Sequence, residues 1–203
     1  PPAPVYYLKT DGSTDYAGVR GAPFSFTEQA YPRLTASPDG KWLYLAGVGR
    51  SVGPFGNSDP LVLRWPRNGG GIAEPFLGKS QKGGKGRFTA SPGSDNESFN
   101  SPAGIDCDAQ GRVYVCDYLN NRIQIFSPEG RYLKTVAANR PMLIRVHQKT
   151  GALYVLHTVM SGGKAVSRFT KFGPFDDLRE AFHQDGIGAG LFALDSWSPK
   201  PRL

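Results

Sequence analysis

The 203-residue sequence lacks several features that would assign it to a class directly. No apolar run approaches the ~20 residues of a membrane-spanning helix, and no long stretch follows helical periodicity. There are two cysteines, and the three histidines include no His-x-x-x-His pair. These absences exclude a helical membrane span and a zinc motif of the metalloprotease type, and they leave the redox compartment open.

Glycine, proline and aromatic residues are abundant. The sequence contains 26 Gly and 17 Pro, and 12% of its residues are aromatic, so it has many turn formers between bulky β-formers. With 39% hydrophobic residues, a chain of this length can bury one sizeable core. The composition therefore predicts a globular all-β domain. The first residues include no Met and no apolar signal region, so we expect the native translation start to lie elsewhere. The location stays open, with a slight preference for an extracytoplasmic or secreted protein.

The segment 101–135 contains four short β-type runs separated by turn signals. The expected strands are 103–107, 113–116, 123–126 and 132–136, and the expected turns are 108–111 and 127–130. Four antiparallel strands in about 40 residues are typical of one blade of a β-propeller. We expect the first strand to be innermost and the fourth outermost.

Weaker copies of this segment lie on both sides. The downstream features, at an offset of about 40 residues, are Pro141, Gly151 and the run 153–155, which match Pro102, Gly111 and the run 113–115. The upstream copy, at an offset of about 70 residues, has strands at 42–45 and 61–65 and therefore carries insertions.

Repeat counting predicts a single β-propeller domain over 1–203, with about three whole blades and two partial ones. The expected sections are 1–30 (end of a blade and linker), 31–100 (blade with insertions), 101–139 and 140–188 (blades), and 189–203 (start of a further blade, with a first strand at 191–195). Either the chain is part of a larger, six-bladed propeller, or its ends join to close a four-bladed ring.

The middle repeat also resembles a known family. The segment 101–135 is similar to an NHL repeat, whose hallmark is a Pro-x-Gly-Ile-x-x-Asp strand, a Val-Tyr-Val-x-Asp strand and an Asn-x-Arg-Ile-x-x-Phe strand that ends in Gly. The matching residues are Pro102, Gly104, Ile105, Asp108, Asp117, Asn120 or Asn121, Arg122, Ile123, Phe126 and Gly130. The downstream copy carries His157 where Asp117 would stand.

Some propellers of this kind are enzymes, such as amidating lyases, lactonases and relatives of strictosidine synthase, which hold a metal or a base at the mouth of the central channel. In the lyase-like members, the channel histidine follows the proline of a first strand. The equivalent residues here are Arg33, Ala103, Met142 and Phe192, and none has an imidazole. The resemblance therefore implies no metal or cofactor in this part of the ring.

Three residues of the NHL pattern are interpreted as structural. Asp108 opens a turn and can accept hydrogen bonds from backbone amides, and Asp117 is expected to pair with Arg122 beside the next strand. Because Asp106, Asp108 and Asp117 are close in sequence, ligation of Ca²⁺ is the alternative.

The two cysteines lie on adjacent strands of one hairpin. If the turn contains a glycine bulge, Cys107 faces Val113 while Cys116 faces Gly104, so the thiols point to opposite faces and are out of disulfide reach. This register predicts buried free thiols. A shift of one residue would place both on the same face.

The net charge of +7 suggests a polyanion as a partner, and the basic residues Lys79, Lys82, Lys85 and Arg87 form the obvious site. The glycines among them favour a flexible, solvated loop inserted between blades. Gly86 follows Lys85 where a P-loop requires Ser or Thr. The loop also lacks aromatic residues between its charges, so it adds little to an RNA-binding hypothesis.

Two further patterns suggest catalysis and are interpreted otherwise. Residues 49–53 fit Gly-x-Ser-x-Gly, but Pro54 prevents the helix that a nucleophile elbow requires, so we expect a loop. The histidines are expected at dispersed surface positions, with His147 on a hairpin turn, His183 in a short helix at 176–183, and His157 apart from both.

In the absence of a catalytic set, the sequence predicts a non-catalytic NHL-type propeller, an interaction or scaffold module for a protein, peptide or glycan. We expect Arg33, Met142 and Phe192 to project from first strands toward the channel mouth and to contact the ligand. The alternatives are a hydrolase or lyase with catalytic residues in further blades, and an RNA-binding protein with a basic surface. No cofactor is expected.

Overall fold

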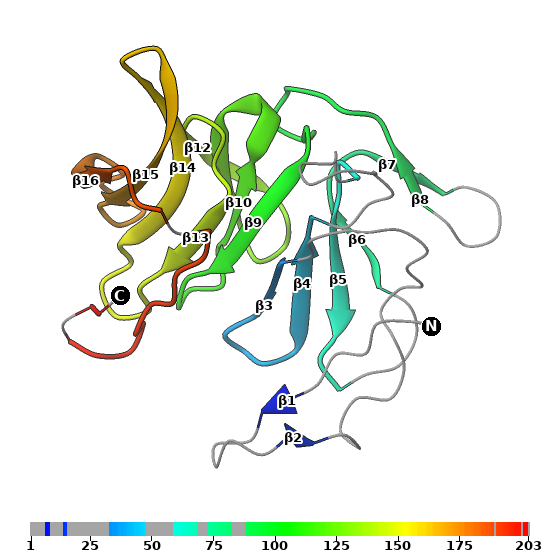
Figure 1. Ribbon diagram of the computed structural model, residues 1–203. Coiled ribbons are helices and arrows are strands. Elements are labelled where there is room, and N and C mark those ends of the chain that lie inside the picture. Colours follow the sequence, from blue (N-terminus) through cyan, green and yellow to red (C-terminus); the bar gives the residue numbers. More distant parts are fainter. Residues whose placement is uncertain are drawn as a thin grey trace.

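The computed structural model describes residues 7–8, 14–15, 33–47, 59–68, 73–82, 88–188, 190–199 and 201–202. In this part of the chain, β-strands form three four-stranded antiparallel sheets and two short hairpins, and there is no α-helix (Figure 1). No described segment forms a helix with the length and hydrophobicity that crossing a bilayer requires.

Each four-stranded sheet is a meander, and we name the sheets blades I, II and III in chain order. Blade I comprises β3 (Arg33–Ala36), β4 (Trp42–Ala46), β5 (Val62–Pro66) and β6 (Glu74–Leu77). Blade II comprises β9 (Pro102–Cys107), β10 (Val113–Asp117), β11 (Arg122–Phe126) and β12 (Tyr132–Ala137), with a 3-10 turn, η2 (Tyr118–Asn120), between β10 and β11. Blade III comprises β13 (Leu143–Val146), β14 (Leu153–Ser161), β15 (Lys164–Phe172) and β16 (Glu180–Asp185). The short hairpins are β1 (Tyr7–Leu8) with β2 (Thr14–Asp15), and β7 (Ser80–Lys82) with β8 (Phe88–Ala90).

The first strands of the three blades lie side by side. Strand β9 contacts β3 of blade I on one side and β13 of blade III on the other, while the later strands of each meander lie progressively farther out (Figure 1). This arrangement is that of neighbouring blades in a β-propeller. The predicted all-β propeller fold, with four-stranded antiparallel blades and the first strand innermost, is confirmed.

A common turn links the first two strands of every blade. The turn opens at Ser37, Asp108 or His147, and it contains a glycine with positive φ at Gly40, Gly111 or Gly151. At Gly111, φ is 79° and the amide donates to the Asp108 carbonyl, a backbone conformation that residues with a Cβ rarely adopt. The spacing of the glycines therefore fixes where each hairpin reverses.

Apolar side chains fill the spaces between blades. One cluster joins blades I and II through residues such as Val62, Ile105 and Val113, and a second joins blades II and III through residues such as Ile123 and Ile144. Because blade II is covered on both faces, every residue of β10 is buried. Successive side chains of β10 point to opposite faces of the blade and therefore pack into two different cores.

The close approach of two first strands requires a glycine. A Cβ atom added at Gly104 would lie 2.9 Å from the Met142 carbonyl oxygen and 3.0 Å from the Cys116 sulfur. Both contacts are too short for a methyl group, and one of them is with backbone. The glycine of the Pro-x-Gly-Ile pattern therefore lets β9 and β13 pack together.

The cysteine prediction is confirmed. Cys107 pairs with Val113 in the ladder, and its thiol lies in the cluster between blades I and II, whereas the Cys116 thiol lies between blades II and III. Both are buried free thiols, and burial raises their pKa values.

Two secondary-structure predictions are wrong. The helix expected at 176–183 is replaced by a turn, in which the Asp177 amide donates to the Pro174 carbonyl, followed by β16. Pairing with β15 outweighs the local helical preference. The segment 191–195, expected to be a first strand, forms no ladder with a described strand and packs on blade III through Phe192 and Leu194.

The expected surface positions of two histidines are also wrong. His147 and His157 are buried, with 0% and 6% of their surface exposed, and only His183 is exposed. His147 does lie on the hairpin turn between β13 and β14, where its ring is held by the Thr150 hydroxyl and the Ser198 carbonyl. His157 bonds to the Thr170 hydroxyl, and burial lowers its pKa. The two histidines stand where blade II has the carboxylates Asp108 and Asp117.

Candidate functional site

A buried carboxylate at the centre of the described sheets joins all three blades. Asp106 on β9 accepts hydrogen bonds from the Thr35 hydroxyl of blade I at 2.8 Å and from the Val146 amide of blade III at 2.8 Å. The Cys107 amide is a third donor, at 2.9 Å. Burial raises the pKa of Asp106, and the three donors oppose that rise. Its oxygens are therefore occupied by fixed donors.

A second buried carboxylate holds the chain that enters blade II. Asp117 is 0% exposed and accepts from the Asn100 amide at 2.7 Å, from Asn120 and from Arg122 Nε at 2.7 Å. The Arg122 guanidinium also donates to the carbonyls of Ser94, Asp95 and Ser98. Burial raises the pKa of Asp117, whereas these donors lower it. The pair thus ties the segment 94–100 to the edge of blade II.

The third carboxylate, Asp108, closes the β9–β10 turn. It accepts from the backbone amides of Gln110 and Arg112, from Arg112 Nε at 2.5 Å and from the Tyr114 hydroxyl at 2.9 Å. The Arg112 guanidinium also lies 4.0 Å from the ring centre of Phe175, and Lys134 Nζ lies 4.1 Å from the same ring. Two cations of blade II therefore hold one aromatic ring of blade III.

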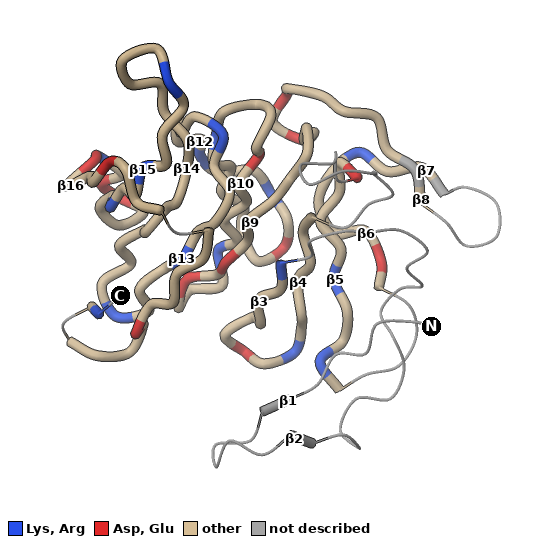
Figure 2. Tube along the Cα trace, viewed as in Figure 1, with Lys and Arg blue, Asp and Glu red and all other residues tan. Residues whose placement is uncertain are grey.

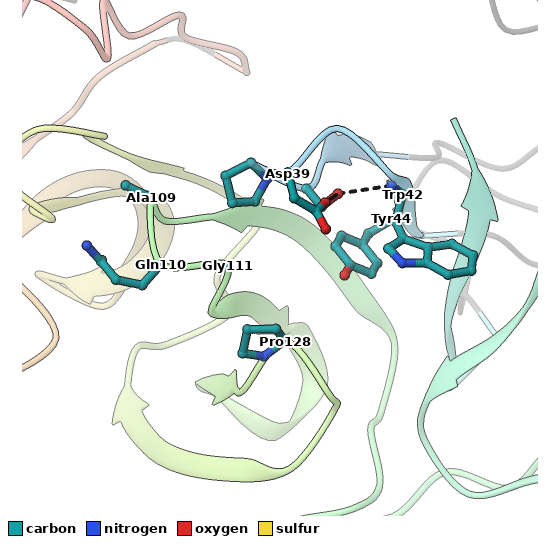
Figure 3. A pocket seen from close by; sticks show the side chains of 9 residues that line it. Asp39, Trp42, Tyr44, Ala109, Gln110, Gly111 and Pro128 are labelled. Carbon is teal, nitrogen blue, oxygen red and sulfur yellow. Dashed lines mark hydrogen bonds between the residues drawn. The ribbon is translucent and has the colours of Figure 1, made fainter. Parts of the chain in front are cut away.

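A groove opens between blades I and II on the rim that carries the first turns. Its volume is about 460 Å³, within the range of small-ligand sites. Its lining comes from the turn and second strand of blade I and from two turns of blade II (Figure 3). The lining residues are Ser37, Pro38, Asp39, Trp42, Tyr44, Ala109, Gln110, Gly111 and Pro128. Gly111 lies between the two prolines, since a Cβ there would meet Pro128 at 3.1 Å and Pro38 at 3.8 Å.

The hydroxyl of Tyr44 is the distinctive group of this groove. Strand register places Tyr44, Tyr114 and Tyr154 at equivalent positions of the three blades, opposite Thr35, Asp106 and Arg145. The Tyr114 hydroxyl donates to Asp108, but blade I has Ser37 at the position of Asp108. The Ser37 hydroxyl is already bonded to the Asp39 carboxylate and the Trp42 amide.

The Tyr44 hydroxyl has no hydrogen-bond partner among the described residues, although only 3% of Tyr44 is exposed. Figure 3 shows this hydroxyl pointing into the groove, toward the side formed by Gly111 and Pro128. Burial raises the pKa of Tyr44 to about 12, and the charges of nearby acidic groups add to the rise. The hydroxyl therefore stays protonated at neutral pH and can donate a hydrogen bond to a ligand.

Comparison with known proteins identifies the middle blade. The family model of the NHL repeat matches residues 99–126. This segment is an NHL repeat. It includes Gly104, Asp108, Asp117 and Arg122, which are the glycine, the two carboxylates and the arginine of the contacts described above. A comparison with curated proteins found no match.

The chain is similar to several solved structures at low sequence identity. A luciferin-regenerating enzyme is 17% identical, with a TM-score of 0.47. The match covers 76% of this chain and 43% of the enzyme's chain. The hydrazine synthase of Kuenenia stuttgartiensis is 12% identical, with a TM-score of 0.47. The match covers 81% of this chain and 38% of the synthase chain. The calcium-binding protein regucalcin of Agrobacterium tumefaciens is 15% identical, with a TM-score of 0.42. The match covers 66% of this chain and 39% of the regucalcin chain. The chain thus spans less than half the length of each of these structures.

The residues predicted to contact a ligand are not gathered in one place. Arg33 begins β3 and Met142 directly precedes β13, so both lie at the start of first strands, whereas the groove lies at the other end of β3. Phe192 packs edge-on against Phe169, with 5.1 Å between ring centres, on the face of blade III that is turned away from blade II. A contact role for these three residues stays a prediction.

The predicted polyanion loop lies mostly outside the described residues. Lys79 pairs with Asp95 at 3.0 Å and with Glu97 at 3.7 Å, and Lys82 ends β7. Lys85 and Arg87 lie outside the described residues, as does the Gly-x-Ser-x-Gly segment at 49–53. Figure 2 shows Lys and Arg distributed over all three blades among Asp and Glu. In the described part, no three His, Cys, Asp or Glu side chains gather as ligands of a metal ion would.

Sequence reasoning missed the groove. Its residues belong to three turns and a strand of blades I and II. These segments are far apart in sequence and do not form a local motif. One signal was available: the tyrosine recurs in all three second strands, while the aspartate that accepts from it in the NHL repeat is a serine in blade I. A tyrosine hydroxyl without its usual acceptor is free for a ligand.

Proposed function

We propose that this chain is part of a β-propeller that acts as a non-catalytic interaction module, and that its rim groove binds a protein, peptide or glycan. The observation that carries this proposal is the groove between blades I and II, with the Tyr44 hydroxyl in its lining and without a hydrogen-bond partner among the described residues. A hydroxyl that lines a groove and makes no hydrogen bond within the protein can donate one to a ligand. Rigid blades on both sides hold the turns that line the groove, which suits recognition.

The buried carboxylates support a binding role over a hydrolytic one. Asp106, Asp108 and Asp117 each accept at least three hydrogen bonds from amides, hydroxyls or guanidinium groups of the fold. A general base needs a free lone pair within reach of the substrate proton. The donors around these carboxylates instead connect turns and blades.

The test uses a variant that fills the groove. Ala109 is exposed and lines the groove, so Ala109→Trp should block it without disturbing the core. The 203-residue chain is presented to a phage-displayed peptide library and to a glycan array, and the Kd of each enriched ligand is measured by biolayer interferometry. We expect Ala109→Trp to weaken at least one such ligand more than tenfold.

Lys149→Trp is the matched control, because Lys149 is exposed on the corresponding turn of blade III and away from the groove. It should leave affinity unchanged. Ligands that bind both variants as tightly as the parent chain would refute a groove site. Turnover of an ester or lactone substrate by the chain would refute the non-catalytic assignment.

A further inference from the structure

We propose that the occupant of the rim groove is a proline-rich segment in the polyproline II conformation, with the Tyr44 hydroxyl donating a hydrogen bond to one of its main-chain carbonyls. This inference rests on the proposed function and specifies its ligand. It follows from which polar groups of the groove are free, and from the nature of the remaining walls.

Most side-chain acceptors of the groove are already engaged. The Ser37 hydroxyl accepts from the Trp42 amide and donates to Asp39 Oδ1 at 2.5 Å. Asp39 Oδ1 also accepts from the Lys41 amide, and the Lys41 ammonium lies 3.5 Å from Asp39 Oδ2. The Gln110 side-chain oxygen accepts from Arg112 at 3.1 Å. A ligand therefore finds few free acceptors here.

The groups without partners can donate. Among the described residues, neither the Tyr44 hydroxyl nor the side-chain nitrogen of Gln110 has a hydrogen-bond partner. The Tyr44 hydroxyl is fixed, because its ring stacks on Phe76 with 4.9 Å between ring centres. A fixed donor in the wall of a groove favours a ligand that offers an acceptor at that point.

The remaining walls are apolar or aromatic. Pro38, Trp42, Ala109 and Pro128 line the space around the Tyr44 hydroxyl (Figure 3). A polyproline II segment has no internal hydrogen bonds, so its carbonyls point outward as acceptors, and proline has no amide hydrogen to satisfy. Aromatic-lined grooves recognise such segments through ring packing and donation to these carbonyls.

A glycan matches the free hydrogen-bond donors and acceptors of the groove less well. Every sugar hydroxyl both donates and accepts, so a bound sugar needs free acceptors in the wall for its own hydrogens. Of the oxygens that could serve, those of Ser37, Asp39 Oδ1 and Gln110 are bonded within the protein, and Asp39 Oδ2 has only the Lys41 ammonium nearby, at 3.5 Å. The donor-rich, acceptor-poor wall thus favours a peptide carbonyl over a sugar.

The experiment compares the 203-residue parent chain with two tyrosine variants. A phage library of Pro-x-x-Pro peptides is selected against the chain, and an enriched peptide is synthesised together with a version in which Gly-Ser replaces the prolines. We expect the proline peptide to bind and the Gly-Ser version to bind at least tenfold more weakly, as measured by isothermal titration calorimetry. Tyr44→Phe should weaken the proline peptide by about 3- to 10-fold, the contribution of one hydrogen bond.

Two controls separate binding from folding. Tyr154→Phe removes the equivalent hydroxyl in blade III and should leave the affinity unchanged. Tyr44→Phe removes a hydroxyl that makes no bond within the described residues, so its melting temperature should match that of the parent chain.

The outcomes distinguish this inference from the proposed function. If only glycans or proline-free peptides bind in a way that Ala109→Trp blocks, the groove is a binding site and the proline-rich occupant is wrong. Equal affinity of Tyr44→Phe and the parent chain for the proline peptide also overturns the inference. If Ala109→Trp affects no ligand at all, the proposed function is wrong, and this inference is refuted with it.

Discussion

Replacing Arg122 with alanine should lower the free energy of unfolding by about 3–5 kcal/mol, the cost of removing one partner from a buried ion pair. Asp117 is 0% exposed, and the Arg122 side chain is 12% exposed, so water reaches the pair only from the arginine side. The substitution leaves Asp117 with two donors, the Asn100 amide and Asn120. It also removes the donor to three carbonyls of the segment 94–98.

The expected loss corresponds to a fall in melting temperature of roughly 6–20 °C, at about 2–4 °C per kcal/mol for a chain of this size. Urea denaturation followed by tryptophan fluorescence and calorimetric melting would measure both quantities. Arg131→Ala is the control, because the Arg131 side chain is 81% exposed and lies 3.8 Å from Glu129. It should leave the midpoint unchanged.

A double variant tests the reason for the loss. Asp117→Asn in the Arg122→Ala background removes the uncompensated charge, so it should recover part of the lost stability. An Arg122→Ala midpoint equal to that of Arg131→Ala would refute the reasoning. An unchanged midpoint together with lost ligand binding would make Arg122 a contact residue.

Three further predictions concern the carboxylates and the junction of blades II and III. Tyr114→Phe should destabilise the protein by about 1.5–3 kcal/mol in urea, because it removes a donor to buried Asp108; stability equal to that of Tyr44→Phe would contradict this. Phe175→Leu should reduce stability by about 1 kcal/mol through loss of two cation–π contacts, and the effect should vanish if Lys134 and Arg112 are both neutralised. Burial raises the pKa of Asp106 above its ordinary value of 3.8, so the folded state binds more protons than the unfolded state between pH 3.8 and the folded pKa. The stability of the parent chain relative to Asp106→Asn should therefore fall as pH rises through that interval. A difference independent of pH would contradict that shift.

The blade architecture was predictable because it depends on local signals. Turn glycines such as Gly111 and the alternation in 123–126 each act within a few residues, and one hairpin determines the register that separates Cys107 from Cys116. The errors arose where tertiary contacts decide. The segment 180–185 is a strand because β15 offers it a ladder, and 191–195 has the composition of a first strand but only a lateral contact with blade III.

The candidate site was not predictable in the same way. Pro38 and Pro128 lie in turns of different blades, and only the packing of blade I on blade II brings both beside Gly111. The histidines show the same limitation. Polarity alone predicts that His147 is exposed, but the C-terminal segment covers it and supplies the Ser198 carbonyl as a partner.

The position of Asp106 affects how the array unfolds. In repeat proteins, stability is approximately the sum of each repeat and its interfaces with its neighbours. A side chain that bonds to the blades on both sides contributes its full stabilisation only while three consecutive blades are folded. Peeling off blade I or blade III alone removes one donor from a buried carboxylate, which disfavours partly unfolded forms. The Val146 amide should therefore exchange its hydrogen with solvent at the rate set by opening of the three-blade unit, and Thr35→Val in blade I should accelerate exchange at this distant amide.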